Sequence, residues 1–232
     1  MHLKRLHLNL MAVAVLVVGL AAEGGFIHQV AAGSKQAGVS EPNQVLLAAA
    51  SPFEDLTEFA LANDTRGMGQ ALKAYGDQAA AVNKVLSVPA RREMASLLAA
   101  IRRAELQGDN QKVALNSVEA YRVLVESLDP KGLVVPTQVS KLDYVGFKLK
   151  VLLAASPPDW PAIRTTIEAA GRHWHELEPR VGDKGLRDAV KTMLTGLRRA
   201  TVTNNAEMAV FAAQMDLALV DLLEGYFERA AQ

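Results

Sequence analysis

The chain of 232 residues contains no cysteine, so it forms no disulfide bond, no thiolate metal site and no cysteine nucleophile. Only 5% of its residues are aromatic, which disfavours a platform for stacking sugars or bases. Its 25 basic and 25 acidic residues balance, so it lacks the basic surplus with which a general nucleic-acid binder neutralises phosphates. Half of the chain is apolar and 22% is charged, which is the composition of a globular protein.

The sequence also lacks the motifs of common enzymes. It shows no Ser/His/Asp arrangement, no phosphate-binding glycine loop and no paired-histidine zinc helix. Gly67-Met68-Gly69 is too short for a nucleotide loop, and no predicted strand precedes it. We therefore expect a non-catalytic protein, with an enzyme built between its helices as a less favoured class.

Residues 1–22 have the composition of an export signal. Lys4 and Arg5 precede Leu8–Ala22, a nearly continuous apolar run that ends in small residues. The run is shorter than the roughly 20 residues of a membrane-spanning helix, although an uncleaved N-terminal anchor is an alternative. Loss of this segment would leave 23 basic residues against 25 acids, a net charge of −2. The sequence predicts a periplasmic or otherwise extracytoplasmic protein, attached to a membrane only if this segment is retained.

Glycine and small polar residues dominate 23–50, where we expect a flexible linker. Ser51-Pro52-Phe53-Glu54 matches a capping box and predicts that the first helix begins at Pro52. Further prolines bound long proline-free stretches, as expected where helices are separated. No stretch has the period-two alternation of a strand. The predicted helices are 52–63, 65–86, 90–107, 110–129, 138–155, 160–178, 183–201 and 206–229.

Apolar residues recur every three or four positions, a spacing typical of helices packed nearly antiparallel in a bundle. The last predicted helix has one apolar stripe opposite a polar line, and we expect the stripe to be buried. Its apolar stripe is Met208, Phe211, Met215, Leu219, Leu222 and Tyr226, and its polar line is Glu207, Gln214, Asp221 and Glu228.

Two segments indicate an internal duplication. Arg91–Ala104 and Arg187–Ala200 share five identical residues at an offset of 96, and their apolar positions coincide. An asparagine-bearing turn and an alanine- and leucine-rich helix follow each. The alternative is that any two amphipathic helices align this well. We expect an all-α protein of about eight helices in two duplicated four-helix bundle-like halves, 51–129 and 137–232.

The best candidate for chemistry is the hexapeptide Gly171-Arg172-His173-Trp174-His175-Glu176. His173 and Glu176 have the i, i+3 spacing with which one helix can hold a metal ion. With Trp174 in the buried seam, His173 falls on the flank of the helix and Glu176 near its back. The alternative interpretation is therefore two exposed polar residues beside a core tryptophan.

The same six residues resemble the GxHxxE motif of imelysin-like periplasmic proteins, which are exported helical proteins linked to iron uptake. The fold of that family is also internally duplicated. The resemblance implies that His173 and Glu176 are ligands of a transition-metal ion.

Asp216 has apolar helical neighbours on every side, so it needs a raised pKa or a charged partner. Arg198 or Arg199 is the expected partner, and the functional alternative is a ligand or proton-handling group between the halves. The leading hypothesis is an interaction or sensor module that has a protein partner, no nucleic-acid partner and no cofactor. The alternative hypothesis is a metal-binding or metal-delivery protein that uses His173, Glu176 and Asp216.

Overall fold

The structure is a computed structural model that describes residues 39–231, and in that range it contains α-helices, two 3-10 helices and no strand. The predicted all-α class is confirmed, and the last seven predicted helices match observed ones within three residues at each end. The predicted export signal and residues 23–38 of the predicted linker lie outside the described residues. The helices are α1 Glu41–Leu61, α2 Thr65–Val85, α3 Val88–Leu106, α4 Asn110–Glu126, η1 Pro130–Gly132, α5 Thr137–Ala154, α6 Trp160–Leu177, η2 Glu178–Arg180, α7 Lys184–Thr203 and α8 Ala206–Ala230.

Local side-chain caps explain why most helix starts were predictable. Six of the eight α-helices follow a residue whose side chain accepts a hydrogen bond from the backbone N–H three positions later. Such a cap satisfies a backbone donor that has no partner within the helix. The six capping residues are Asp64, Ser87, Asp109, Asp159, Asp183 and Asn205.

The start of α1 corrects the prediction. Ser51 is not its N-cap, because residues 41–50 are already helical and Pro52 is buried inside the helix. The buried side chain of Asn43 anchors this earlier start. It donates to the carbonyl oxygen of Asp129 at 2.8 Å and accepts from the N–H of Asp129 at 2.9 Å. The extra turns bury apolar area that offsets the hydrogen bond lost at the proline. They bury Leu46, Ala49 and Ala50.

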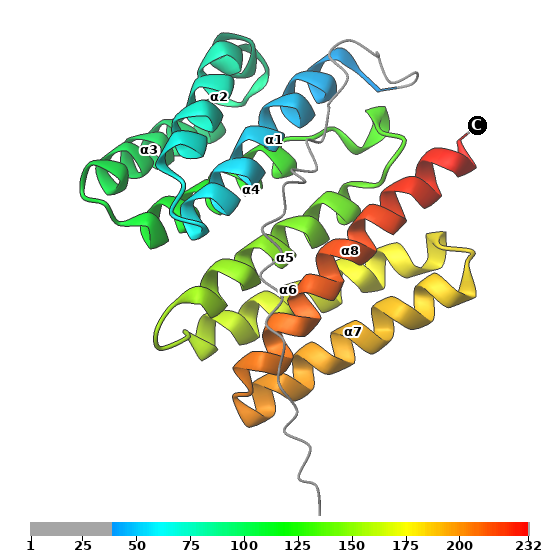
Figure 1. Cartoon of the computed structure of the whole chain (residues 1–232). Helices are drawn as coiled ribbons and strands as arrows, with labels where there is room; N and C mark the ends of the chain where they lie inside the picture. Colours follow the sequence, from blue (N-terminus) through cyan, green and yellow to red (C-terminus); the bar gives the residue numbers. More distant parts are fainter. Residues whose placement is uncertain (1–38, 232) are drawn as a thin grey trace, which may run out of the picture. The chain divides into compact units, whose positions relative to one another are not determined.

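The eight α-helices form two groups, α1–α4 and α5–α8 (Figure 1), each with its own apolar core. In both groups the first helix packs on the second and the fourth, and the third packs on the fourth. A duplication would produce this shared pairing, but so would two unrelated four-helix arrangements of the same connectivity. The duplication therefore stays a prediction.

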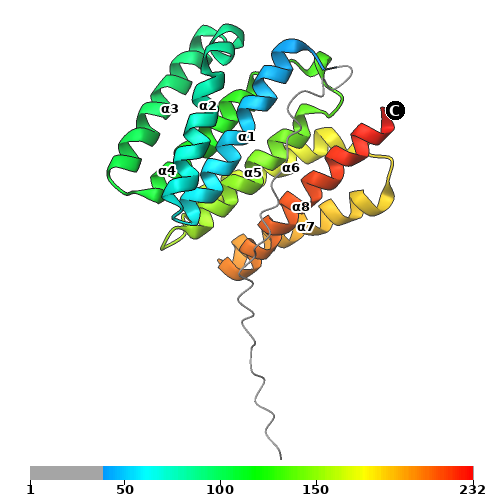
Figure 2. The ribbon, with the colours of Figure 1, turned by 45° about the horizontal axis from the view of Figure 1, so that its top comes forward.

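The two groups meet on α5. This helix packs on α4 and touches α1, while α8 packs on it from within its own group. Figures 1 and 2 show α1, α5 and α8 following one another in that order in both views. Val151 of α5 belongs to the first core, although most buried residues of α5 belong to the second. Within residues 39–231, no helix is both long enough and apolar enough to span a membrane.

The buried face of α8 also corrects the prediction. Leu219 is buried as expected, but four other members of the predicted stripe are between 37% and 65% exposed. These exposed residues are Met208, Phe211, Met215 and Leu222. A face rich in alanine turns towards the rest of the group instead, because small side chains let α8 pack closely. This buried face comprises Ala209, Ala212, Ala213, Asp216, Leu219, Val220, Leu223 and Phe227.

Candidate functional site

Four acidic side chains gather where α5 lies between α1 and α8. Glu54 belongs to α1, Asp143 to α5, and Asp216 and Glu224 to α8. The charge of Asp143 raises the pKa of each of the other three, which places all four within electrostatic reach of one another's helices. We call these four residues the acid cluster.

Burial raises the pKa of every member of the acid cluster. It is the main reason that the pKa of Asp143 rises to about 7, and the nearby charge of Asp221 adds to the rise. The hydroxyl group of Tyr121 donates to Oδ2 of Asp143 at 2.7 Å, and this hydrogen bond acts in the opposite direction. Desolvation followed by the charge of Asp143 raises the pKa of Glu224 to about 7, although part of its side chain contacts solvent. The pKa of Glu54 also lies well above its usual range.

Asp216 is the most enclosed member of the cluster. Its side chain is 1% exposed, and its Oδ2 atom has no hydrogen-bond partner among the described residues. The predicted rise in its pKa is confirmed and comes from burial and then from the charge of Asp143. The expected salt bridge to Arg198 or Arg199 does not form, since neither arginine contributes to the electrostatics of this carboxyl group.

Gly146 on α5 makes room for Asp216. A Cβ atom at this position would lie 2.6 Å from Cδ2 of Leu217 and 3.1 Å from Oδ2 of Asp216. The absence of a side chain therefore permits the close approach of α5 and α8. Because Gly146 lies one turn after Asp143, Oδ2 of Asp216 is directed towards the acid cluster.

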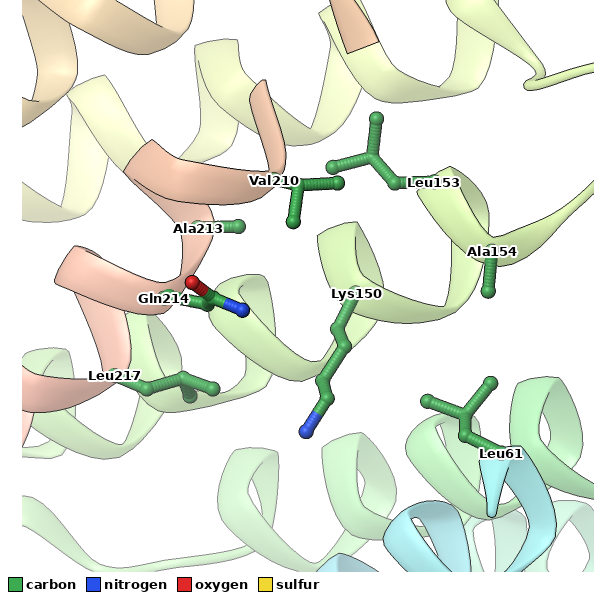
Figure 3. Close-up of a pocket in the computed structure, with 8 residues that line it drawn as sticks. All are labelled: Leu61, Lys150, Leu153, Ala154, Val210, Ala213, Gln214 and Leu217. Carbon is green, nitrogen blue, oxygen red and sulfur yellow. The ribbon is translucent and has the colours of Figure 1, made fainter. Parts of the chain in front are cut away.

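An aliphatic pocket of about 240 Å³ adjoins the acid cluster (Figure 3). The side chain of Lys150 extends from α5 towards the space between α1 and α8, and its ammonium group forms a salt bridge with Glu58 of α1. Leu217 joins the pocket to the cluster, because it lines the pocket and also lies against Gly146 beside Asp216. We call the acid cluster and this pocket together the α5 site. The pocket is lined by Leu61, Lys150, Leu153, Ala154, Val210, Ala213, Gln214 and Leu217.

His173 and Glu176 occupy α6, outside the α5 site, in the positions that the helical wheel predicts. Glu176 is exposed, and one of its carboxylate oxygens accepts a hydrogen bond from Nε2 of Gln138 at 3.2 Å. His173 is half-buried, and burial followed by the charge of Lys141 lowers its pKa. A lowered pKa keeps the imidazole neutral at pH 7, which is the form that binds metals.

The structure does not bring the three predicted metal ligands together. His173 lines a small pocket of about 80 Å³ that also contains Glu126 of α4, but Glu126 already pairs with Arg122 at 2.6 Å. Across residues 39–231, no three histidine or carboxylate side chains are arranged to hold a metal ion. Asp216 lies in the α5 site instead. Metal binding through His173 and Glu176 stays a prediction.

Calorimetric titration with iron, copper and zinc ions tests this prediction. Zinc in proteins takes three or four protein ligands, so we expect binding no tighter than about 10 µM from the pair on α6. His173→Ala should then leave the titration unchanged, as should the control His175→Ala at the exposed neighbouring histidine. Tighter binding that His173→Ala abolishes and His175→Ala preserves would instead support the metal-binding hypothesis.

Sequence reasoning found Asp216 but missed its three partners. Glu54, Asp143 and Glu224 each have polar neighbours along the chain, so each has the sequence pattern of a solvent-facing acid. Their proximity depends on how three helices pack and leaves no local signal. One signal was available at Gly146, because an isolated glycine within a strongly apolar helix often has a packing reason.

No protein-family model matches the chain, and no curated protein or solved structure shows significant similarity to it. The resemblance to imelysin-like proteins in six residues therefore gains no support from these comparisons.

Proposed function

We propose that the chain is an exported, non-catalytic interaction module that binds a protein partner on α8. Four exposed side chains, Met208, Phe211, Met215 and Leu222, define what we call the α8 face. Their spacings of three, four and seven residues place them on one side of the helix along roughly 21 Å. Single exposed apolar residues are ordinary, whereas a continuous row of them is typical of a docking surface. This row is the observation that carries the proposal.

The charges around the α8 face favour a basic partner over a second copy of the chain. Glu207, Asp221, Glu224 and Glu228 are exposed acids on α8, while Arg229 is its one basic residue. Two copies of α8 laid together would bring like charges close to one another, which opposes association. An amphipathic helix whose apolar row is flanked by lysine or arginine has the complementary pattern.

The proposal of export depends on the composition of the first 22 residues, with Lys4 and Arg5 ahead of the apolar run Leu8–Ala22. Cell fractionation combined with the intact mass of the purified envelope form tests it. Cleaved export removes the apolar run and its two basic residues from the measured mass. A full-length product confined to the cytosol would contradict this part of the proposal.

The absence of cysteine makes site-specific crosslinking a clean test of the α8 face. Phe211→Cys places a unique thiol on the face, and Leu106→Cys at an 89% exposed position on α3 provides a matched control. We expect a thiol-reactive photocrosslinker at position 211, and not at position 106, to capture one defined partner in envelope extracts.

Binding of the purified partner then decides whether the face is specific. Phe211→Glu should weaken binding by about tenfold or more, because it places a charge in an apolar interface, while Leu106→Glu should leave the Kd unchanged. Equal losses in both variants would contradict the proposal. A chain that forms dimers in ultracentrifugation, and loses them in Phe211→Glu, would contradict it as well.

A further inference from the structure

Asp216 has no role in the proposed docking of a partner, since it lies on the buried side of α8. A carboxyl group buried without a hydrogen bond or a counter-charge costs free energy of folding. A cationic ligand that binds there would recover this cost. The buried and unpartnered Oδ2 atom of Asp216 therefore points to a ligand, independently of the number of acids around it.

The charges around the acid cluster have one sign. Asp55, Asp221 and Glu228 add to the rise in pKa of its members. Among the described residues, no lysine or arginine is close enough to change the pKa of any of the four acids. Lys150 is on the same helix as Asp143, but it forms its salt bridge with Glu58. The site therefore has unmet attraction for a cation.

We infer that the α5 site binds a small organic cation, a protonated primary amine with an aliphatic arm. The ammonium group lies among the carboxylates of the acid cluster, and the arm lies in the aliphatic pocket. The acids are not arranged as metal ligands within residues 39–231, so an ion without an apolar part leaves the pocket unused. The pocket suits a small molecule, because its volume of about 240 Å³ equals that of about eight water molecules.

The spacing along α8 sets the length of the arm. Leu217 in the pocket and Glu224 in the acid cluster are separated by two turns, or roughly 10 Å at 1.5 Å per residue. An arm of about six carbon atoms covers most of this distance with the ammonium group included. Ligands that carry the charge without the arm, or the arm without the charge, match only one part of the site.

Calorimetric titration of the purified full chain with hexylammonium tests the inference. We expect binding in the micromolar to millimolar range that is at least about tenfold tighter than for methylammonium, because methylammonium lacks the arm. Hexanoate has the same arm and the opposite charge, so it should not bind. Ionised acids attract the ammonium group and protonated acids do not, so affinity should rise between about pH 6 and pH 8.5, where an alkylamine stays protonated.

Variants locate the binding. Asp143→Asn and Asp216→Asn should each weaken hexylammonium binding by about tenfold, the cost of one charge-assisted contact in a buried site. Asp77→Asn changes an exposed acid on α2 and serves as the matched control, with no change expected. Thermal unfolding of each variant verifies that it is folded, and Asp216→Asn is expected to be the more stable protein.

Several results would overturn the inference. They are the absence of hexylammonium binding up to about 10 mM, equal binding of hexanoate, and equal losses in Asp77→Asn and Asp216→Asn. Binding of calcium or magnesium ions at the acid cluster in preference to the amine would also overturn it. None of these results bears on docking at the α8 face, because Phe211 and its neighbours are outside the α5 site.

Discussion

Replacing Asp216 by asparagine is expected to stabilise the folded protein at pH 8. In the unfolded chain this carboxyl group ionises near its ordinary pKa of 3.8, whereas burial raises the pKa in the folded protein. Folding at pH 8 must therefore either bury the charge or retain a proton, and both cost free energy. Asparagine does neither. One pKa unit corresponds to about 1.4 kcal/mol, so a gain of about 2 kcal/mol is expected after the cost of burying the amide.

The acid cluster also sets the sign of the pH dependence. The folded protein holds Asp143 and Glu224 at a pKa of about 7, while their ordinary values are 3.8 and 4.5. Between these values the folded state retains protons that the unfolded chain releases, so the free energy of unfolding falls as the pH rises. Each retained proton contributes a slope of about 1.4 kcal/mol per pH unit in that window. The stabilising contribution is complete below the ordinary values and lost above about pH 7.

Two other sets of groups act against this slope. The pKa of His173 is lowered, so protonation of this residue in the unfolded chain destabilises the fold as the pH falls below its ordinary value. The pKa of Asp109 and of Asp188 is also lowered by paired lysines, and both lose their favourable contacts in stronger acid. One histidine opposes four acids between pH 5.5 and 8.5, so the acid cluster determines the net direction.

Urea unfolding at about pH 5.5, 7 and 8.5, followed by helical circular dichroism, measures both effects. Wild type should lose stability across this range, and Asp216→Asn should lose less while exceeding wild type at the highest pH. Asp77→Asn, at an exposed acid, should follow wild type. A stability that does not change with pH, or an Asp216→Asn variant weaker than wild type at pH 8.5, would show that the buried carboxyl group is compensated.

The second large effect is expected at Arg122 of α4, where Arg122→Met should lower the free energy of unfolding by about 2 kcal/mol. Its guanidinium group forms salt bridges with Glu93 of α3 and with Glu119 and Glu126 of α4. Glu119 also accepts a hydrogen bond from Lys148 of α5 at 2.8 Å. The network therefore joins α3, α4 and α5 and so connects the two helix groups. It is intermediate between an exposed pair and a buried one, since the Arg122 side chain is 24% exposed.

Lys184→Met is the matched control, because Lys184 forms an isolated salt bridge whose lysine is 80% exposed. It should change the free energy of unfolding by less than about 0.5 kcal/mol. A double-mutant cycle of Arg122→Met with Glu119→Gln isolates the coupling between these two residues. If Arg122→Met changes stability no more than Lys184→Met does, the network makes no net contribution to the fold.

Stability and the proposed ligand binding are expected to oppose each other at Asp216. Asp216→Asn should give a more stable protein that binds hexylammonium less tightly. Such a trade-off is common where a binding site requires groups that fold unfavourably without their ligand. Measuring both properties in one variant separates a loss of the site from a loss of the fold.

The sequence by itself determined the helices wherever their signals are local. Asp64, Asp109 and Asp159 cap their own helices, so the pattern of nearby residues was sufficient to locate those starts. The exposure of Glu176 and the flank position of His173 also followed from helical periodicity alone, because a helix fixes the relative directions of its side chains.

Only the tertiary structure decided the features that depend on distant parts of the chain. The start of α1 depends on Asn43 contacting Asp129, which is 86 residues away, and so the serine and proline at 51 and 52 were misleading. α8 carries apolar residues on two sides, and its periodicity could not choose which side packs against the other helices. The acid cluster needs α1, α5 and α8 together. Local rules determine how a helix forms, whereas the packing of helices decides which of its faces meet water.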